Sequence, residues 1–129
     1  MHRSLPLFLA LAMPAFAAEP VGVAEFEAFA TGKTLTYSVG GTVYGAEQYL
    51  PGRRVIWAFK GQQCRKGFWY EEAGQVCFVY EDDPSAQCWA FSRDGDGLQA
   101  RFSGDPEGAE PAQVQEAAPL TCAGPDLGV

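Results

Sequence analysis

The sequence predicts a mainly β (α+β) domain in which one short N-terminal helix packs on an antiparallel meander of about 6–8 strands. Three observations support this class. Only one segment has helical periodicity, short runs rich in aromatic and β-branched residues follow Lys33, and turns containing Gly or Pro recur about every 8–12 residues. A meander of this kind forms a curled sheet or a small calycin-like barrel, because closure removes exposed edges.

Residues 23–31 form the predicted helix. Val23, Phe26, Phe29 and Ala30 recur at spacings that place them on one helical face. Gly32 follows at a position where helices commonly end. Because the helix is short, it must pack on the sheet to persist.

The rest of the chain to residue 115 alternates between strands and turns. Strands are expected near residues 34–39, 42–49, 53–60, 67–71, 76–81, 88–92 and 98–103, with one more at 113–115. Turns are expected at residues 40–41, 51–52, 61–63, 73–74, 83–85 and 94–97. The runs at 68–70 and 77–80 put bulky residues on both faces of their strands. We therefore expect the helix to cover one face of these strands and barrel closure to cover the other.

Residues 1–17 have the pattern of a signal peptide. A basic start with Arg3 precedes an apolar core of about 12 residues, shorter than the roughly 20 needed to span a bilayer. Ala15-Phe16-Ala17 predicts cleavage between Ala17 and Ala18. A buried N-terminal helix is the alternative, and two prolines disfavour it. We expect residues 18–129 to be a single domain in the periplasm or secreted, monomeric and not membrane-anchored.

Four cysteines, Cys64, Cys77, Cys88 and Cys122, lie within residues 18–129. An even count in a small exported domain predicts two disulfides, and four cysteines allow three pairings. Their spacing does not match a zinc site. Residues 104–129 form a tail rich in Pro and Gly, and we expect Cys122 to staple this tail to the domain.

The formal net charge of −7 argues against a nucleic-acid partner, because such binding depends on neutralising phosphates. Basic residues nevertheless concentrate between positions 53 and 66, and acidic residues dominate from Glu71 onward. These charges are either solvated hairpin ends or a basic rim that meets an anionic ligand or partner.

Common catalytic groups are absent from residues 18–129, because the only histidine is His2 and bridged cysteines supply no thiol. We therefore expect no enzymatic activity, no cofactor and no metal.

The run at 93–97 resembles a calcium loop, but Leu98 stands where an oxygen ligand belongs and Gln99 where Gly belongs. Carboxylate-only hydrolysis is a less favoured alternative, with its acids at positions 71–72 and 81–83.

Aromatic residues supply the candidate binding site. Rings on adjacent strands can line the mouth of a barrel, and an arginine at the rim can add a polar group. The candidate binding residues are Trp57, Trp69, Tyr70, Trp89, Arg53 and Arg54. The alternative is that the rings fill the core.

Several short motifs give the chain a resemblance to a known group. They are Thr31-Gly32-Lys33-Thr34-Leu35, Gly67-Phe68-Trp69, Cys77 and Cys88-Trp89. The chain resembles, over residues 23–103, small exported proteobacterial proteins, frequent in alphaproteobacteria, that are classed as a domain of unknown function. The resemblance implies a compact periplasmic β domain and the disulfides Cys77–Cys88 and Cys64–Cys122. The first of these bridges needs a bulge, because a tight hairpin places Cys88 nearly opposite Val79.

These observations favour a periplasmic or secreted binding or interaction module, one form of which recognises another exported protein. The alternative is a calycin-like carrier of a small apolar or anionic ligand.

Overall fold

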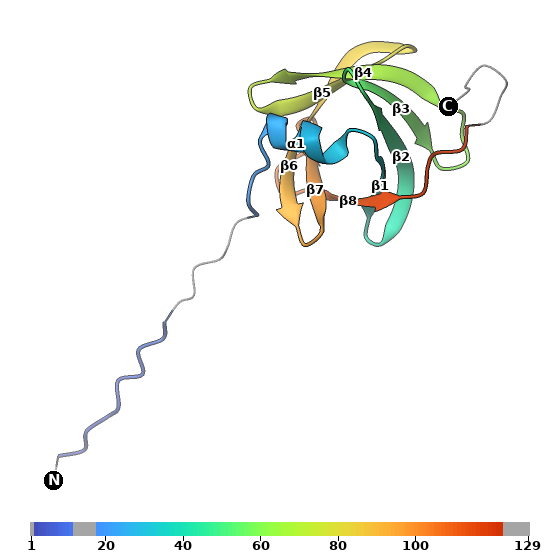
Figure 1. The fold of residues 1–129 in the computed structure, drawn as a ribbon. Coiled ribbons are helices and arrows are strands. Elements are labelled where there is room, and N and C mark those ends of the chain that lie inside the picture. The colour runs from blue at the N-terminus through green and yellow to red at the C-terminus, as the bar shows by residue number, and fades with distance from the viewer. Residues whose placement is uncertain (1, 12–17, 123–129) are drawn as a thin grey trace.

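The computed structural model describes residues 2–11 and 18–122. Eight antiparallel strands follow one another in sequence order and close into a barrel through pairing of the first strand with the last (Figure 1). The elements are α1 (Val23–Ala30), β1 (Thr34–Val39), β2 (Thr42–Leu50), β3 (Arg54–Phe59), β4 (Arg65–Glu72), β5 (Gln75–Tyr80), β6 (Asp83–Asp94), β7 (Gly97–Phe102) and β8 (Ala112–Ala117). The mainly β prediction is confirmed, and the sheet is a closed barrel.

Helix α1 lies across one end of the barrel (Figure 1). Phe26 is fully buried there, and its ring centroid lies 5.5 Å from that of Tyr49, 5.6 Å from that of Trp69 and 4.4 Å from that of Phe91. The chain before the helix is held by β6, because the Val21 amide donates to the Phe91 carbonyl at 2.9 Å. The helix therefore plugs the barrel end and packs on inward-facing rings.

The expectation that the helix covers one face of the central strands holds only at one end of the barrel, where Phe26 of α1 packs on the inward Trp69 of β4. On β4, Trp69 is buried inside the barrel, whereas Phe68 on the outer face is 49% exposed. The outer face of β3 is covered instead by the C-terminal segment, where Leu120 and Cys122 pack on Ile56. The helix buries its apolar face at the end of the barrel, because the inward-facing rings there form an apolar surface on which it packs.

Strand β6 is longer than expected and includes the predicted turn at residues 83–85. The reversal occurs one step earlier, at residues 81–82. The pairing of β5 with β6 shifts register between Phe78 and Tyr80, so β6 carries the extra residues of a bulge. Pro84 falls within this irregular stretch, where the ladder does not need its missing N–H.

Two disulfides join Cys77 to Cys88 and Cys64 to Cys122, which is the pairing that the resemblance implies. The bulge in β6 places Cys88 directly opposite Cys77. The second bridge ties the C-terminal segment to the β3–β4 connection, with 5.5 Å between its Cα atoms. No helix within residues 2–11 and 18–122 has the length and hydropathy to cross a membrane.

Residues 2–11 have no regular secondary structure and are exposed, including Leu5 and Phe8. The predicted cleavage motif at 15–17 lies outside the described residues.

Candidate ligand-binding cavity

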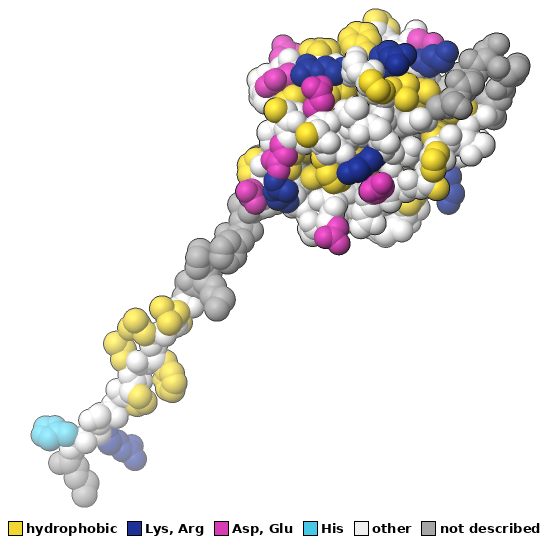
Figure 2. All heavy atoms as spheres, in the orientation of Figure 1, with side chains coloured by type: hydrophobic (Ala, Val, Ile, Leu, Met, Phe, Trp, Pro, Cys, Tyr) yellow, Lys and Arg dark blue, Asp and Glu magenta, His cyan; other side chains and the backbone are white. Residues whose placement is uncertain are grey.

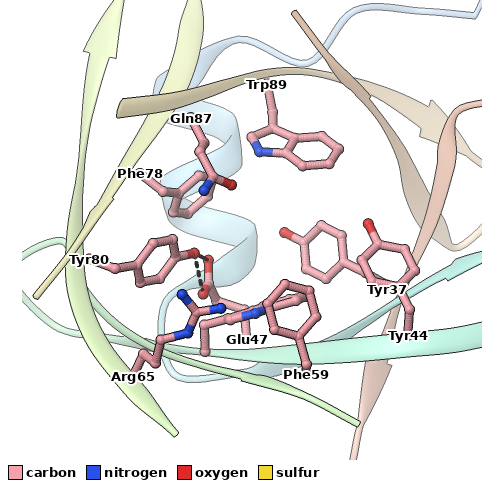
Figure 3. A pocket seen from close by; sticks show the side chains of 10 residues that line it. Tyr37, Tyr44, Glu47, Phe59, Arg65, Phe78, Tyr80, Gln87 and Trp89 are labelled. Atoms are coloured by element: carbon pink, nitrogen blue, oxygen red, sulfur yellow. Dashed lines mark hydrogen bonds between the residues drawn. The ribbon is translucent and has the colours of Figure 1, made fainter. Parts of the chain in front are cut away.

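A cavity of about 80 Å³ lies inside the barrel. It takes side chains from six consecutive strands, β1 to β6, and seven of its lining residues are aromatic. The lining residues are Tyr37, Tyr44, Glu47, Trp57, Phe59, Arg65, Phe78, Tyr80, Gln87 and Trp89. Figure 3 shows the labelled side chains pointing into one common space, with α1 behind it.

The pleat of each strand explains why these residues share the interior. Alternate residues of a strand point to one face, so Trp57 and Phe59 of β3 both point inward, as do Phe78 and Tyr80 of β5. Tyr44 joins them through a bulge, because the β1–β2 register shifts at this residue. The bulge turns the Tyr44 ring toward the cavity.

A glycine makes room for one of the rings. Gly45 occupies an inward position of β2, and a Cβ atom added there would lie 2.3 Å from Trp57 Cζ2. Such a contact is far inside van der Waals distance, so only glycine lets the indole lie in its observed position. Gly45 and Trp57 are thus matched in size across neighbouring strands.

The cavity has a closed floor and an open mouth. Glu47, Phe78 and Tyr80 are buried, whereas Phe59 is 37% exposed and Trp89 is half-buried. The exposed members lie toward the barrel end away from α1. Solvent therefore reaches the cavity from the end opposite the helix.

Glu47 is the only buried acidic or basic residue among the described residues of the barrel, and it is 2% exposed. Tyr80 donates its phenolic hydroxyl to the two carboxylate oxygens at 2.8 and 3.1 Å (Figure 3). Burial raises the pKa of Glu47 to about 8, and the Tyr80 hydrogen bond opposes part of this rise. The carboxyl group is consequently protonated in much of the protein at neutral pH.

No cation compensates Glu47. Among the described residues, no Lys or Arg nitrogen lies within 4.0 Å of its carboxylate oxygens. A buried acid without a cationic partner is costly to ionise. The floor of the cavity therefore holds an uncompensated acidic group.

Two further tyrosines meet beside Glu47. The hydroxyl oxygens of Tyr37 and Tyr49 lie 2.5 Å apart, and both rings are buried. Burial raises the pKa of each phenol well above its usual value. Both remain neutral, and Tyr37, which lines the cavity, adds polarity to the floor without adding charge.

Arg65 lies at the mouth of the cavity. Its guanidinium carbon is 5.0 Å from the centroid of the Phe59 ring and 6.0 Å from that of the Tyr80 ring. Its Nη1 atom is 3.0 Å from Oδ2 of the exposed Asp82, so the guanidinium forms a salt bridge with this carboxylate. At the mouth, aromatic rings thus already contact the guanidinium group of Arg65.

The predicted aromatic residues divide between cavity, core and surface. Trp57 and Trp89 line the cavity. Trp69 does not line it; it packs beneath α1 against Phe26. Tyr70 pairs with Cys77 on the outer face of the barrel.

The two predicted rim arginines lie at the helix end, away from the cavity mouth. Arg53 bonds through Nε to Glu27 of α1 at 2.9 Å and covers the Trp69 ring at 4.4 Å. Arg54 donates to the Pro51 carbonyl at 3.3 Å. The residue that supplies a guanidinium at the mouth is Arg65, which is paired in register with Trp57.

Sequence reasoning missed both Glu47 and Arg65 as cavity residues. A usable signal existed for Glu47, because it alternates with Gly45 and Tyr49 at inward positions of one strand. An acid at a position whose neighbours on the same face are apolar points to a buried functional group.

The candidate catalytic carboxylates are divided between the two ends of the barrel. Glu71 and Glu72 end β4 at the turn before β5, whereas Asp82 and Asp83 lie at the turn after β5. Asp82 pairs with Arg65, and Asp83 accepts the Ser85 amide at 2.9 Å. Because β5 separates the two groups, they do not form one site.

The cavity therefore combines an aromatic wall, a polar floor with one acid and a single accessible end, a combination suited to holding a small molecule. No family model, curated protein or solved structure matches the chain.

Proposed function

We propose that this protein is a calycin-like carrier that binds a small organic molecule inside its barrel. The observation that carries the proposal is the cavity itself, with buried residues at its floor and partly exposed aromatic rings at its mouth. Pockets that bind small molecules are mostly apolar and contain a few polar groups that fix orientation. Glu47, Tyr80 and Arg65 supply such groups within the aromatic wall.

The size of the cavity limits the ligand. One water needs about 10–15 Å³, and about 150 Å³ holds a benzene ring. At about 80 Å³, the cavity accepts a compact group of a few heavy atoms, and any larger part must extend through the mouth. A long acyl chain does not fit this volume, so the ligand is small or presents a small head group.

We also propose that the protein works outside the cytoplasm. Two disulfides indicate an oxidising environment. The apolar side chains of residues 5–11 are exposed and take no part in the barrel core, so the barrel does not depend on this segment (Figure 2). A short apolar stretch after a basic start is the pattern of an export signal.

The three tryptophans provide a built-in test of ligand binding. Trp57 and Trp89 line the cavity, whereas Trp69 lies beneath α1. We expect titration with small alcohols and small amines to shift the indole N–H resonances of Trp57 and Trp89 in a saturable way. Two-dimensional ¹H–¹⁵N NMR of the cleaved, disulfide-bonded protein measures these shifts directly.

Trp69 is the internal control for that titration. It should stay within error of its starting position while the two cavity indoles move. Absence of any saturable shift across neutral, cationic and anionic small molecules would sink the proposal. Equal movement of all three indoles would point to surface association and count against it as well.

A second candidate function is recognition of another exported protein. Phe68 is 49% exposed on the outer face of β4, next to exposed Lys66 and in register with exposed Arg54. An apolar residue between two cations suits an acidic surface with an apolar contact. Pull-down from periplasmic extract should recover a partner that the Phe68→Ser/Lys66→Glu variant loses. Recovery of the same proteins by both baits contradicts this candidate.

A further inference from the structure

The polar floor of the cavity lies within a shell of aromatic rings. Tyr80 contacts the Glu47 carboxyl directly, and Tyr37, Trp57 and Phe78 line the same space. The electron-rich faces of such rings attract organic cations, and the attraction is stronger where water is excluded. A buried carboxyl beneath aromatic walls therefore offers two kinds of favourable contact to the same positive charge.

Resting on the proposed carrier function, we propose that the ligand is a small organic cation whose alkylammonium group sits against Glu47 within the aromatic shell. Glu47 supplies the compensating negative charge, and Tyr44, Phe59 and Trp89 surround the part of the ligand nearer the mouth.

The charges around the cavity favour a cation over an anion. A cation can pair with the ionised Glu47 carboxylate, which has no cationic partner among the described residues, whereas an anion gains no ion pair there. The one guanidinium at the mouth is already paired with Asp82 at 3.0 Å. The whole chain carries a formal net charge of −7, so its long-range field attracts cations.

The size of the cavity agrees with this choice. A methylated ammonium group is compact and carries no extended chain, which suits a cavity volume of about 80 Å³. Choline adds a hydroxyethyl arm that can extend toward the open mouth. Methylated ammonium ions are also the cations that aromatic cages recognise best, because they are weakly hydrated.

Binding of a cation should release a proton from Glu47. The pKa of this group is raised to about 8 by burial, and a bound cation favours its ionised form. The titratable and charged groups that face or neighbour Glu47 are Tyr37, Tyr44, Tyr49, Tyr80 and Arg65. The four phenols have pKa values raised above 10, whereas the pKa of Glu47 is about 8, so Glu47 titrates before any of them.

The test compares molecules of one shape and different charge. Choline is the cation, 3,3-dimethylbutan-1-ol is its neutral isostere, and 3,3-dimethylbutanoate is an anion of similar size. Isothermal titration calorimetry at pH 9 should show choline binding at least about 10-fold tighter than the alcohol. Below pH 8 the apparent affinity for choline should fall about 10-fold per pH unit, whereas that for the alcohol should stay flat.

Two variants separate charge from aromatic contact. Glu47→Gln keeps the size of the side chain and removes its charge, so it should abolish both the preference for choline and its pH dependence. Trp89→Leu removes a half-buried ring at the mouth and should weaken choline by at least about 5-fold, with a smaller effect on the alcohol. The indole N–H spectrum of each variant shows whether the barrel is still folded.

The outcomes also separate this inference from the carrier function. If the alcohol binds as well as choline, or the anion binds better than both, the cation proposal is wrong while the carrier function stands. If choline does not bind but small alcohols shift the indole resonances of Trp57 and Trp89, the same conclusion follows. If no compound enters the cavity, both proposals fail.

Discussion

Tyr80 donates its phenolic hydroxyl to the carboxyl group of Glu47, and the two residues come from strands β5 and β2 on different sides of the barrel. Both side chains are buried, so this contact links distant parts of the barrel wall through its interior. Burial raises the pKa of Glu47, the only buried acid among the described residues, and this contact opposes part of the rise. We therefore expect changes at this hydrogen bond to alter the stability of the barrel, its dependence on pH and the choice of ligand.

The stability of the barrel should fall as pH rises from about 5 to 8. The pKa of Glu47 is raised from 4.5 to about 8 in the folded protein, so the folded state holds its proton more tightly than the unfolded state. The stabilisation is complete below the unfolded pKa and is lost as pH rises through the folded one, at up to about 1.4 kcal/mol per pH unit. Urea denaturation at pH 5, 7 and 9 measures this slope. Glu47→Gln should flatten it, and an unchanged slope in that variant would contradict our assignment.

Tyr80→Phe should raise the pKa of Glu47 further. The hydrogen bond from Tyr80 lowers that pKa, so its loss leaves the burial effect unopposed. Leaving the buried carboxyl without this donor should cost about 1–3 kcal/mol of stability. Titration of the Glu47 side-chain carboxyl carbon by ¹³C NMR reports the pKa in both proteins. A lower pKa in the variant would show that the hydrogen bond has the opposite effect.

Gly45→Ala should disturb the cavity wall. The added Cβ would lie 2.3 Å from the Trp57 ring and 2.9 Å from the Ala58 carbonyl oxygen, so the indole must move. We expect a loss of about 1–3 kcal/mol in stability and a shift of the Trp57 indole N–H resonance. Gly22→Ala is the control, because nothing lies within 4 Å of a Cβ there. Equal effects of the two substitutions would be inconsistent with this packing.

Phe26→Ala should destabilise the protein strongly by removing the centre of the plug. Phe26 is 0% exposed and contacts Tyr49, Trp69 and Phe91, so its loss should cost about 3–5 kcal/mol. Phe68→Ala is the matched control, since that ring is 49% exposed and should cost much less. Chemical denaturation of both variants tests the comparison. Similar losses would mean that α1 does not close the barrel in solution.

The two disulfides should contribute unequally. Cys64–Cys122 spans 58 residues and Cys77–Cys88 spans 11. The chain-entropy model assigns about 4 kcal/mol to the first and about 3 kcal/mol to the second. Paired Cys→Ser variants, one for each bridge, should therefore unfold at different urea concentrations, with the Cys64→Ser/Cys122→Ser variant lower. The reverse order would show that local packing outweighs loop closure.

Local patterns in the sequence predicted much of the fold. The helix at 23–31 and the strands at 34–39 and 98–103 agree with the structure to within one residue at each end, because each lies between clear turn signals. The turn predicted at Asp83-Pro84-Ser85 is wrong, because these residues form the start of a bulged strand. Its register depends on the pairing of Cys88 with Cys77 rather than on local preference.

The sequence by itself determined the class of the domain, the order of its strands, the presence of one helix and the even set of cysteines, since these follow from periodicity, turn residues and composition. Only the tertiary structure decided which end the helix closes and which residues face the cavity. Closure depends on pairing Thr34 with Ala117, far apart in the chain, and it sets the direction of every inward side chain at once. That is why Arg65 lies at the mouth and Glu47 at the floor, whereas Arg53 lies against α1.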